Sequence, residues 1–239
     1  MNSTPISLDL VVLCGGRGVR LRPATDSIPK ALVPVDGRPI IDHIFDFLTQ
    51  QGMQRVHLCI GYKGDMVRHH FASCSIDISF SDLGEDASML SRLFALRNSL
   101  SERFLIAYCD TYIDLNIEEL LEHHQASAAK ATIITASISN PFGIVSYGDD
   151  NKVRSFQEKP VQKHFIGYTL MERSVFDSVT PQQLAMPDGD GLVALFNNLI
   201  KTSDLSSYEH EGLNITFNTA SERMDVEHLL QRYYTLQNR

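Results

Sequence analysis

Residues 10–35, LVVLCGGRGVRLRPATDSIPKALVPV, contain the pattern that decides the fold. The apolar run Leu8–Cys14 predicts a fully buried strand of a parallel sheet. Where this strand would enter a loop, there are three glycines: Gly15, Gly16 and Gly18. Glycine lets a backbone approach a ligand closely, so the amides of such a loop can point at phosphate oxygens. Arg20 and Lys30 follow with positive charge, and the stretch therefore predicts a polyphosphate-binding loop.

The glycine pattern differs from two common nucleotide-binding motifs. The dinucleotide fingerprint requires a third glycine where this chain has Leu21. A P-loop requires Gly-Lys-Ser/Thr, which does not occur in the sequence. Taken alone, a glycine-rich turn after a first strand is equally well explained as a tight turn.

Length and composition exclude several classes of protein. A chain of 239 residues with 43% hydrophobic and 21% charged residues is typical of one globular α/β domain, here residues 1–239. The formal charge of −8 argues against a nucleic-acid partner. The sequence has no apolar run of membrane-spanning length, and the N-terminus does not have the pattern of a signal peptide. We therefore expect no membrane partner. No Cys-x-x-Cys pair occurs, and Cys14, Cys59 and Cys109 lie in or beside apolar runs, so we expect reduced core cysteines of a cytoplasmic protein.

Strand and helix patterns alternate through the first half of the chain. Strands are expected at 56–60, 76–80 and 104–108, and helices at 39–51, 65–71 and 87–100. The second half predicts a helix at 117–127, strands at 132–137, 165–171 and 215–217, a hairpin of strands 144–147 and 152–157, a helix at 192–200 and a closing helix at 221–236. Ligands of parallel sheets bind beyond the carboxyl ends of the strands, which places the glycine loop and Asp110 on one rim.

The string G-G-x-G-x-R-L-x-P at 15–23, followed by P-K-A-L-V-P-V at 29–35, resembles the signature of the sugar-1-phosphate nucleotidyltransferases. The usual threonine is replaced by Val19. The resemblance implies a Rossmann-like α/β fold with a mixed, mostly parallel sheet flanked by helices. It also implies catalytic roles for Arg20 and Lys30. The nucleotide-binding residues that it implies are Leu13, Gly15, Gly16, Gly18 and Gly84, although the loop after Gly84 departs from the family by two added acids.

Three later motifs resemble the sugar-phosphate-binding half of the same family. They are Phe142-Gly143-Ile144-Val145, the sequence S-F-Q-E-K-P at 155–160 and F-I-G-Y-T-L at 165–170. The resemblance implies that the sugar phosphate is bound by Gly143, Glu158, Lys159 and Gly167. By itself, Glu-Lys-Pro would be a surface turn.

The resemblance also implies Mg²⁺ as the cofactor. Asp110 is expected to be a metal ligand, because Mg²⁺ prefers oxygen ligands and bridges phosphates. At the second metal position the family has aspartate and this chain has Asn218, a neutral ligand. Asp225 is a possible substitute.

The implied reaction transfers a nucleoside monophosphate from a nucleoside triphosphate to a sugar 1-phosphate and releases pyrophosphate. Residues 1–115 would bind the nucleotide and residues 116–239 the sugar phosphate. Sequence details resemble both glucose-1-phosphate cytidylyltransferases and heptose-1-phosphate guanylyltransferases, which favours CTP or GTP as the donor. Two alternatives stay open: transfer to an acceptor such as phosphocholine, and a catalytically idle paralogue with a binding or regulatory role. A homo-oligomer is also possible.

Overall fold

The computed structural model describes residues 8–53, 55–217 and 228–231, and its centre is a seven-stranded sheet. In order across the sheet, the strands are β12 (Leu205–Glu209), β8 (Ala131–Ser139), β11 (Val161–Glu172), β6 (Arg103–Tyr108), β1 (Asp9–Leu13), β4 (Arg55–Ile60) and β5 (Asp77–Asp82). β11 is antiparallel to both neighbours, and the other neighbouring pairs are parallel. The predicted mixed, mostly parallel sheet is confirmed.

Helices cover both faces of this sheet, and β1 shows why. Leu10 and Val12 belong to one buried cluster, together with side chains of α2 (Ile40–Gln50), α3 (Gly64–His70) and α5 (Ile117–Ser127). Val11 and Leu13 belong to a second cluster, with α4 (Met89–Ala95) and α7 (Asp190–Lys201). Successive side chains of a strand point to opposite faces, so an uninterrupted apolar strand requires cover on both sides.

The first half of the chain supplies β1, β4, β5 and β6, and the second half supplies β8, β11 and β12. Most predicted elements are present, but α4 is shorter than the predicted helix at 87–100. The Ser88 side chain accepts a hydrogen bond from Ser91 N and caps the first turn, and the helix ends at Ala95. Of the predicted closing helix, residues 228–231 are described and are helical.

The sequence did not predict several short elements. They are η1 (Val19–Leu21), α1 (Ala24–Ser27), η2 (Lys30–Leu32), η3 (Arg173–Ser178), α6 (Pro181–Leu184), the ribbon of β2 (Pro34–Val35) and β3 (Arg38–Pro39), and the strand β7 (Thr111–Ile113) that pairs with β13 (Asn214–Thr216). The edge strand β12, Leu-Ser-Ser-Tyr-Glu, was also missed. These segments are too short or too polar to show a hydrophobic period.

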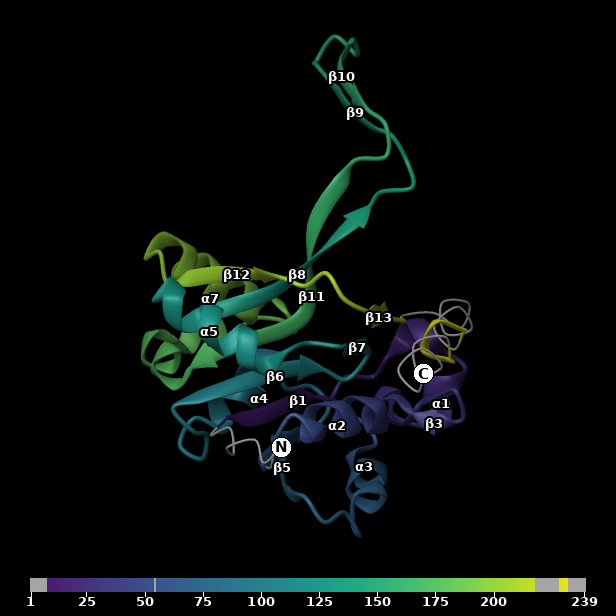
Figure 1. The fold of residues 1–239 in the computed structure, drawn as a ribbon, viewed down its shortest axis with the longest axis vertical. Helices are drawn as coiled ribbons and strands as arrows, with labels where there is room; N and C mark the ends of the chain where they lie inside the picture. The colour runs from purple at the N-terminus through teal and green to yellow at the C-terminus, as the bar shows by residue number, and fades with distance from the viewer. Residues whose placement is uncertain (1–7, 54, 218–227, 232–239) are drawn as a thin grey trace.

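The predicted hairpin is confirmed, as β9 (Ile144–Tyr147) and β10 (Val153–Gln157), and it stands off the body of the molecule (Figure 1). We call residues 140–160 the arm. The strand register places Val145, Tyr147, Val153 and Phe156 on one face, with exposed fractions of 43%, 70%, 62% and 64%. A two-stranded hairpin is marginally stable by itself in water, so this apolar face is unusual.

The amino end of β1 carries a polar network at the opposite end of the strand from the glycine loop. Asp9 is 3% exposed and accepts hydrogen bonds from Arg55, His57 and both the amide and the hydroxyl of Ser101. Burial by itself would raise the pKa of Asp9, but these hydrogen bonds outweigh burial and lower the pKa to about 2. The network ties β1 to β4 and to the segment before β6.

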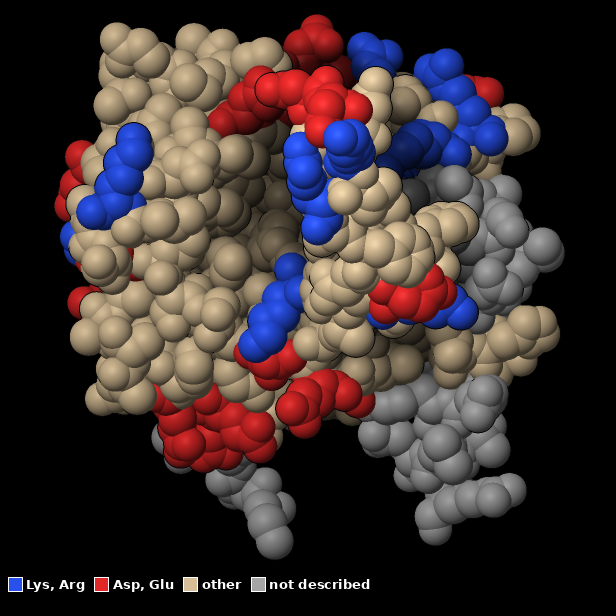
Figure 2. Space-filling view, turned by 90° about the horizontal axis from the view of Figure 1, so that it is seen from above, with Lys and Arg blue, Asp and Glu red and all other residues tan. Residues whose placement is uncertain are grey.

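The helices and the surface charges bear on contact with membranes and nucleic acids. No helix in the described ranges combines the length and the apolar character that crossing a membrane requires. Viewed along the arm, acidic and basic side chains are interspersed around a hollow, without a continuous basic stripe among the coloured residues (Figure 2).

Candidate functional site

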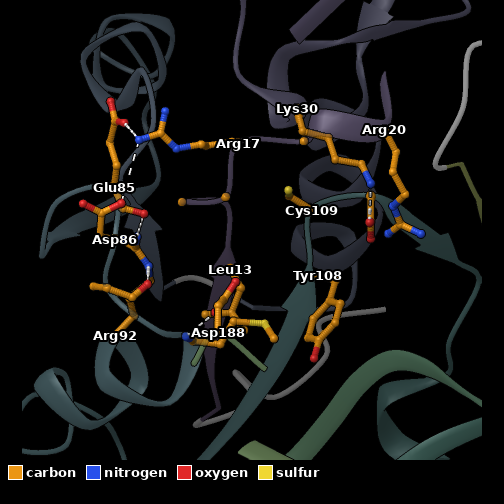
Figure 3. Close-up of a pocket in the computed structure, with 16 residues that line it drawn as sticks. Leu13, Arg17, Arg20, Lys30, Glu85, Asp86, Arg92, Tyr108, Cys109 and Asp188 are labelled. Atoms are coloured by element: carbon orange, nitrogen blue, oxygen red, sulfur yellow. Dashed lines mark hydrogen bonds and ion pairs between the residues drawn. The ribbon is translucent and has the colours of Figure 1, made fainter. Parts of the chain in front are cut away.

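The carboxyl ends of the parallel strands open into a cavity of about 550 Å³. The glycine loop follows β1, the Gly84 loop follows β5, and Asp110 follows β6. Most residues that the sequence predicted for the nucleotide side line this cavity: Leu13, Gly15, Gly16, Gly18, Arg20, Lys30 and Asp110. Gly84 lies just before the lining residues Glu85, Asp86 and Ala87. The predicted rim therefore exists as one cavity (Figure 3).

Lys30 and Asp110 form an ion pair in the wall of this cavity. Their Nζ–Oδ2 distance is 2.6 Å, and the two side chains are 12% and 18% exposed. Thr111 donates a hydrogen bond to the other carboxylate oxygen, Oδ1, at 3.1 Å. The pair places a positive and a negative group side by side in a partly buried site, where charge interactions are stronger than in bulk water.

Arg20 lies at the junction of two cavities. A second cavity, of about 510 Å³, shares Arg20, Tyr108 and Asp110 with the first and is also lined by Gly167. Asn214 lines it too, and its buried Oδ1 has no hydrogen-bond partner in the part of the chain that is described. The two cavities therefore meet at Arg20 and Asp110, an arrangement that can hold two substrates side by side.

The glycines of the site have different reasons to be glycine. Gly18 has φ +59°, in the left-handed region that favours glycine. A Cβ atom at Gly15 would lie 2.6 Å from the guanidinium carbon of Arg92, whereas one at Gly16 would meet nothing within 4 Å. Gly167, with φ +83°, sits where the register of β11 shifts and packs on Tyr108. Of these positions, Gly16 is open toward a ligand.

The structure does not bring Gly143, Glu158 and Lys159 to this site. They lie together on the arm at the open end of the hairpin, just before β9 and just after β10, and none of them lines either cavity. Of the predicted sugar-phosphate residues, Gly167 alone reaches the second cavity. The reason is the geometry of the arm, which extends from β8 and β11 away from the body (Figure 1).

The candidate metal ligands are only partly described. Asn218 and Asp225 lie outside the described residues, and Asp110 is on the rim. Within the ranges described, no group of three or more His, Cys, Asp and Glu residues could hold a metal by itself. A single rim carboxylate still fits Mg²⁺, which commonly uses one or two carboxylates together with substrate phosphates and water.

Tyr108 and the buried cysteines near the cavity are held in their neutral forms. Burial, and then the charges of Asp110 and Asp188, raise the pKa of Tyr108 to about 12, so its phenol stays protonated. Burial raises the pKa of Cys59 and of Cys109 to about 12. Cys14, Cys59 and Cys109 are buried free thiols, as expected, and such thiols are poor nucleophiles.

Several residues of the cavity are not evident from the sequence. Arg17, on the glycine loop, pairs with Glu85 at 2.5 Å, and the Asp188 carboxylate accepts a hydrogen bond from Met89 N at 2.8 Å. Arg92, on α4, also lines the cavity and is 3% exposed. An arginine within an otherwise apolar helix face was a signal for Arg92, but only the fold shows which loops it reaches.

Comparison with known proteins agrees with this geometry. Residues 10–188 match the family model described as nucleotidyl transferase. A probable glucose-1-phosphate cytidylyltransferase of Bacillus subtilis is 27% identical over 242 residues, covering 90% of this chain and 93% of that protein. Among solved structures, a putative glucose-1-phosphate thymidylyltransferase of Bacillus anthracis has a TM-score of 0.74 at 20% identity, covering 93% of this chain and 94% of that one. The CTP:phosphocholine cytidylyltransferase of Streptococcus pneumoniae has a TM-score of 0.69 at 21% identity, covering 94% of this chain and all of that one.

Proposed function

The chain belongs to the nucleotidyl transferase family, and we propose that it transfers a nucleoside monophosphate from a nucleoside triphosphate to a sugar 1-phosphate. The observation that carries this proposal is the pair of adjoining cavities that share Arg20 and Asp110. The first, with the glycine loop and Lys30, suits the triphosphate, and the second suits the acceptor. A cytidylyltransferase name for a relative of nearly the same length supports CTP as donor, with GTP as the other candidate.

In this reaction a phosphate oxygen of the acceptor forms a bond to the α-phosphorus. The bond from that phosphorus to the oxygen bridging to the β-phosphate breaks, and pyrophosphate leaves with the electron pair. Such transfers need positioning and charge stabilisation more than covalent help. Arg20, at the junction of the cavities, would bind the transferring phosphate, and Lys30 would bind the triphosphate.

Asp110 is the residue that would hold Mg²⁺ in this site, with Asn218 as the proposed second ligand. When bound, the ion neutralises phosphate charge and orients the phosphates. Lys30 already neutralises Asp110 in the structure, so Lys30 would have to exchange this carboxylate for phosphate oxygens when nucleotide binds.

For the acceptor side, we propose that Gly167 and the second cavity hold the sugar, and that residues 116–239 form the acceptor half of one domain. Gly143, Glu158 and Lys159 would then contribute to acceptor binding from the arm. Transfer to phosphocholine is the second candidate, since a phosphocholine cytidylyltransferase shares the fold. The idle-paralogue alternative is disfavoured by the assembled cluster of Arg20, Lys30 and Asp110. Nucleoside triphosphate as substrate and the buried free thiols support a cytoplasmic location.

We also propose that the chain forms a homo-oligomer through the arm. The four exposed apolar side chains on one face of β9 and β10 would be buried by twofold packing against the same face of a second copy. Replacing Phe156 and Tyr147 with serine should lower the molar mass measured by light scattering to that of one chain. A wild-type protein that runs as a monomer at all concentrations would contradict this proposal.

The activity is tested by pyrophosphate release. ATP, GTP, CTP, UTP and dTTP should each be combined with several sugar 1-phosphates and with phosphocholine, with Mg²⁺ and with EDTA. We expect release above the EDTA background for one sugar 1-phosphate with CTP or GTP. Release with phosphocholine alone would support the second candidate, and no release with any pair would support an idle paralogue.

A further inference from the structure

Arg92 is a buried cation that is surrounded by backbone carbonyl groups. Its Nε donates to Ala87 O at 3.1 Å, its Nη2 donates to Gly84 O at 2.6 Å and to Glu85 O at 3.3 Å, and its Nη1 donates to Ile60 O. In the described ranges, no carboxylate forms an ion pair with this guanidinium. Because burying a charge is costly, these carbonyl groups compensate the guanidinium, and their positions depend on it in turn.

The guanidinium of Arg92 lies between three segments of the rim. Its carbonyl partners are the last residue of β4, Ile60, and the loop after β5, and its guanidinium atoms fill the space beside Gly15, after β1. The three atoms nearest to a Cβ built at Gly15 all belong to Arg92, at 2.6, 2.7 and 2.9 Å. Gly15 therefore makes room for this side chain.

The position of Arg92 separates its role from that of the reacting groups. Figure 3 shows Arg92 and Glu85 on one side of the cavity, and Lys30 and Arg20 on the other. If the triphosphate lies along Lys30 and Arg20, the loop that Arg92 fixes faces the nucleoside end. Arg17 binds the same loop from the glycine side, through Glu85.

We infer that Arg92 is a positioning residue, which holds the 84–87 loop in place as the wall of the nucleoside end of the cavity. This inference rests on the proposed function. Substituting Arg92 should therefore change the nucleotide KM but not kcat, because Arg92 does not contact the reacting phosphates. Losing it should weaken nucleotide binding and leave the chemical step and the acceptor KM nearly unchanged.

The first test compares Arg92→Lys and Arg92→Ala with the control Arg97→Ala. Arg97 lies just after α4 and stacks on Phe94 at 4.1 Å, outside the cavity. We expect the nucleotide KM of both Arg92 variants to rise by about tenfold or more, since several hydrogen bonds to a charged group are lost, with kcat within about threefold of wild type. An ammonium cannot bridge the end of β4 and the 84–87 loop as a guanidinium does, so lysine should not restore nucleotide binding. The Arg97 variant should behave as wild type.

The second test is a double-mutant cycle of Gly15→Ala and Arg92→Ala, read by equilibrium dialysis of radiolabelled CTP and GTP. Gly15→Ala should weaken binding strongly when Arg92 is present and little when it is absent. Independent effects of the two substitutions would overturn the inference, as would a fall in kcat with an unchanged nucleotide KM. Thermal melting checks folding, and if Arg92→Ala does not fold, Arg92→Lys decides the outcome alone. Dialysis does not require turnover, so an active enzyme with unaltered binding in the Arg92 variants refutes this inference and leaves the proposed function intact.

Discussion

Acidification should weaken the polar network around Asp9, and the structure gives the size of the effect. The folded state holds the pKa of Asp9 at about 2, against an ordinary value of 3.8. Since each pKa unit corresponds to about 1.4 kcal/mol, the ionised carboxylate stabilises the folded state by about 2 kcal/mol at neutral pH. This contribution is complete above the unfolded pKa of 3.8 and is lost as pH falls through the folded pKa of about 2.

The assay is urea unfolding of wild type and Asp9→Asn across the range from pH 7 to pH 2. At pH 7 the substitution should cost about 2 kcal/mol, because the neutral amide loses the charge-assisted hydrogen bonds that Arg55, His57 and Ser101 donate to the carboxylate. The difference between the two proteins should shrink by about 1 kcal/mol by pH 3 and by about 2 kcal/mol below pH 2. At neutral pH the corresponding fall in Tm for a 2 kcal/mol loss would be about 4–8 °C in a chain of this size.

Asp46→Asn is the matched control. Asp46 forms an exposed ion pair with Arg38, and such pairs contribute less than about 1 kcal/mol. Its substitution should shift the whole stability profile slightly, without changing the acid limb. A difference between wild type and Asp9→Asn that stays constant from pH 7 to pH 2 would refute the reasoning.

Three further predictions concern the reaction. Asp110→Asn should abolish activity, whereas Asn218→Asp should be tolerated and should lower the Mg²⁺ concentration at half-maximal rate; a fully active Asp110→Asn would move the metal site elsewhere. Arg20→Ala and Lys30→Ala should each reduce kcat by roughly a hundredfold or more, and Arg20→Lys should also be poor. Tm should change little for Arg20→Ala and should fall for Lys30→Ala, which removes a partly buried ion pair; wild-type turnover would remove that residue from the site. Lys159→Ala should raise the acceptor KM without changing nucleotide affinity in dialysis, and unchanged acceptor kinetics would leave the arm without a role in binding.

Local sequence patterns predicted six of the seven strands of the sheet and placed the glycine loop and Asp110 on one rim. The apolar run of β1 predicted cover on both faces, and the two buried clusters provide it. Asp110 directly follows β6, and its place on the rim followed from the rule that ligands bind beyond the carboxyl ends of parallel strands. These features depend on residues that are close in sequence or on a general property of parallel sheets.

Contacts between distant segments could not be predicted in the same way. In the sequence, Arg92 is one charge within a helix, because its carbonyl partners lie at the end of β4 and in the loop after β5. Glu158 and Lys159 show the reverse problem: the motif gives their chemistry, but only the course of β11 shows that they leave the sheet with the arm. The short polar strand β12 was missed because edge strands need less apolar surface.

In the structure, the positive charge of Lys30 and the negative charge of Asp110 neutralise each other. In the proposed reaction, nucleotide binding is then an ion exchange: Lys30 passes from a fixed carboxylate to phosphate, and Asp110 gives up an internal counter-ion for an external cation. Phosphate without a cation would leave Asp110 uncompensated, and a cation without phosphate would compete with Lys30 for the same oxygens. Each ligand alone should therefore bind weakly, and the two should enter the rim together as a cation–nucleotide complex.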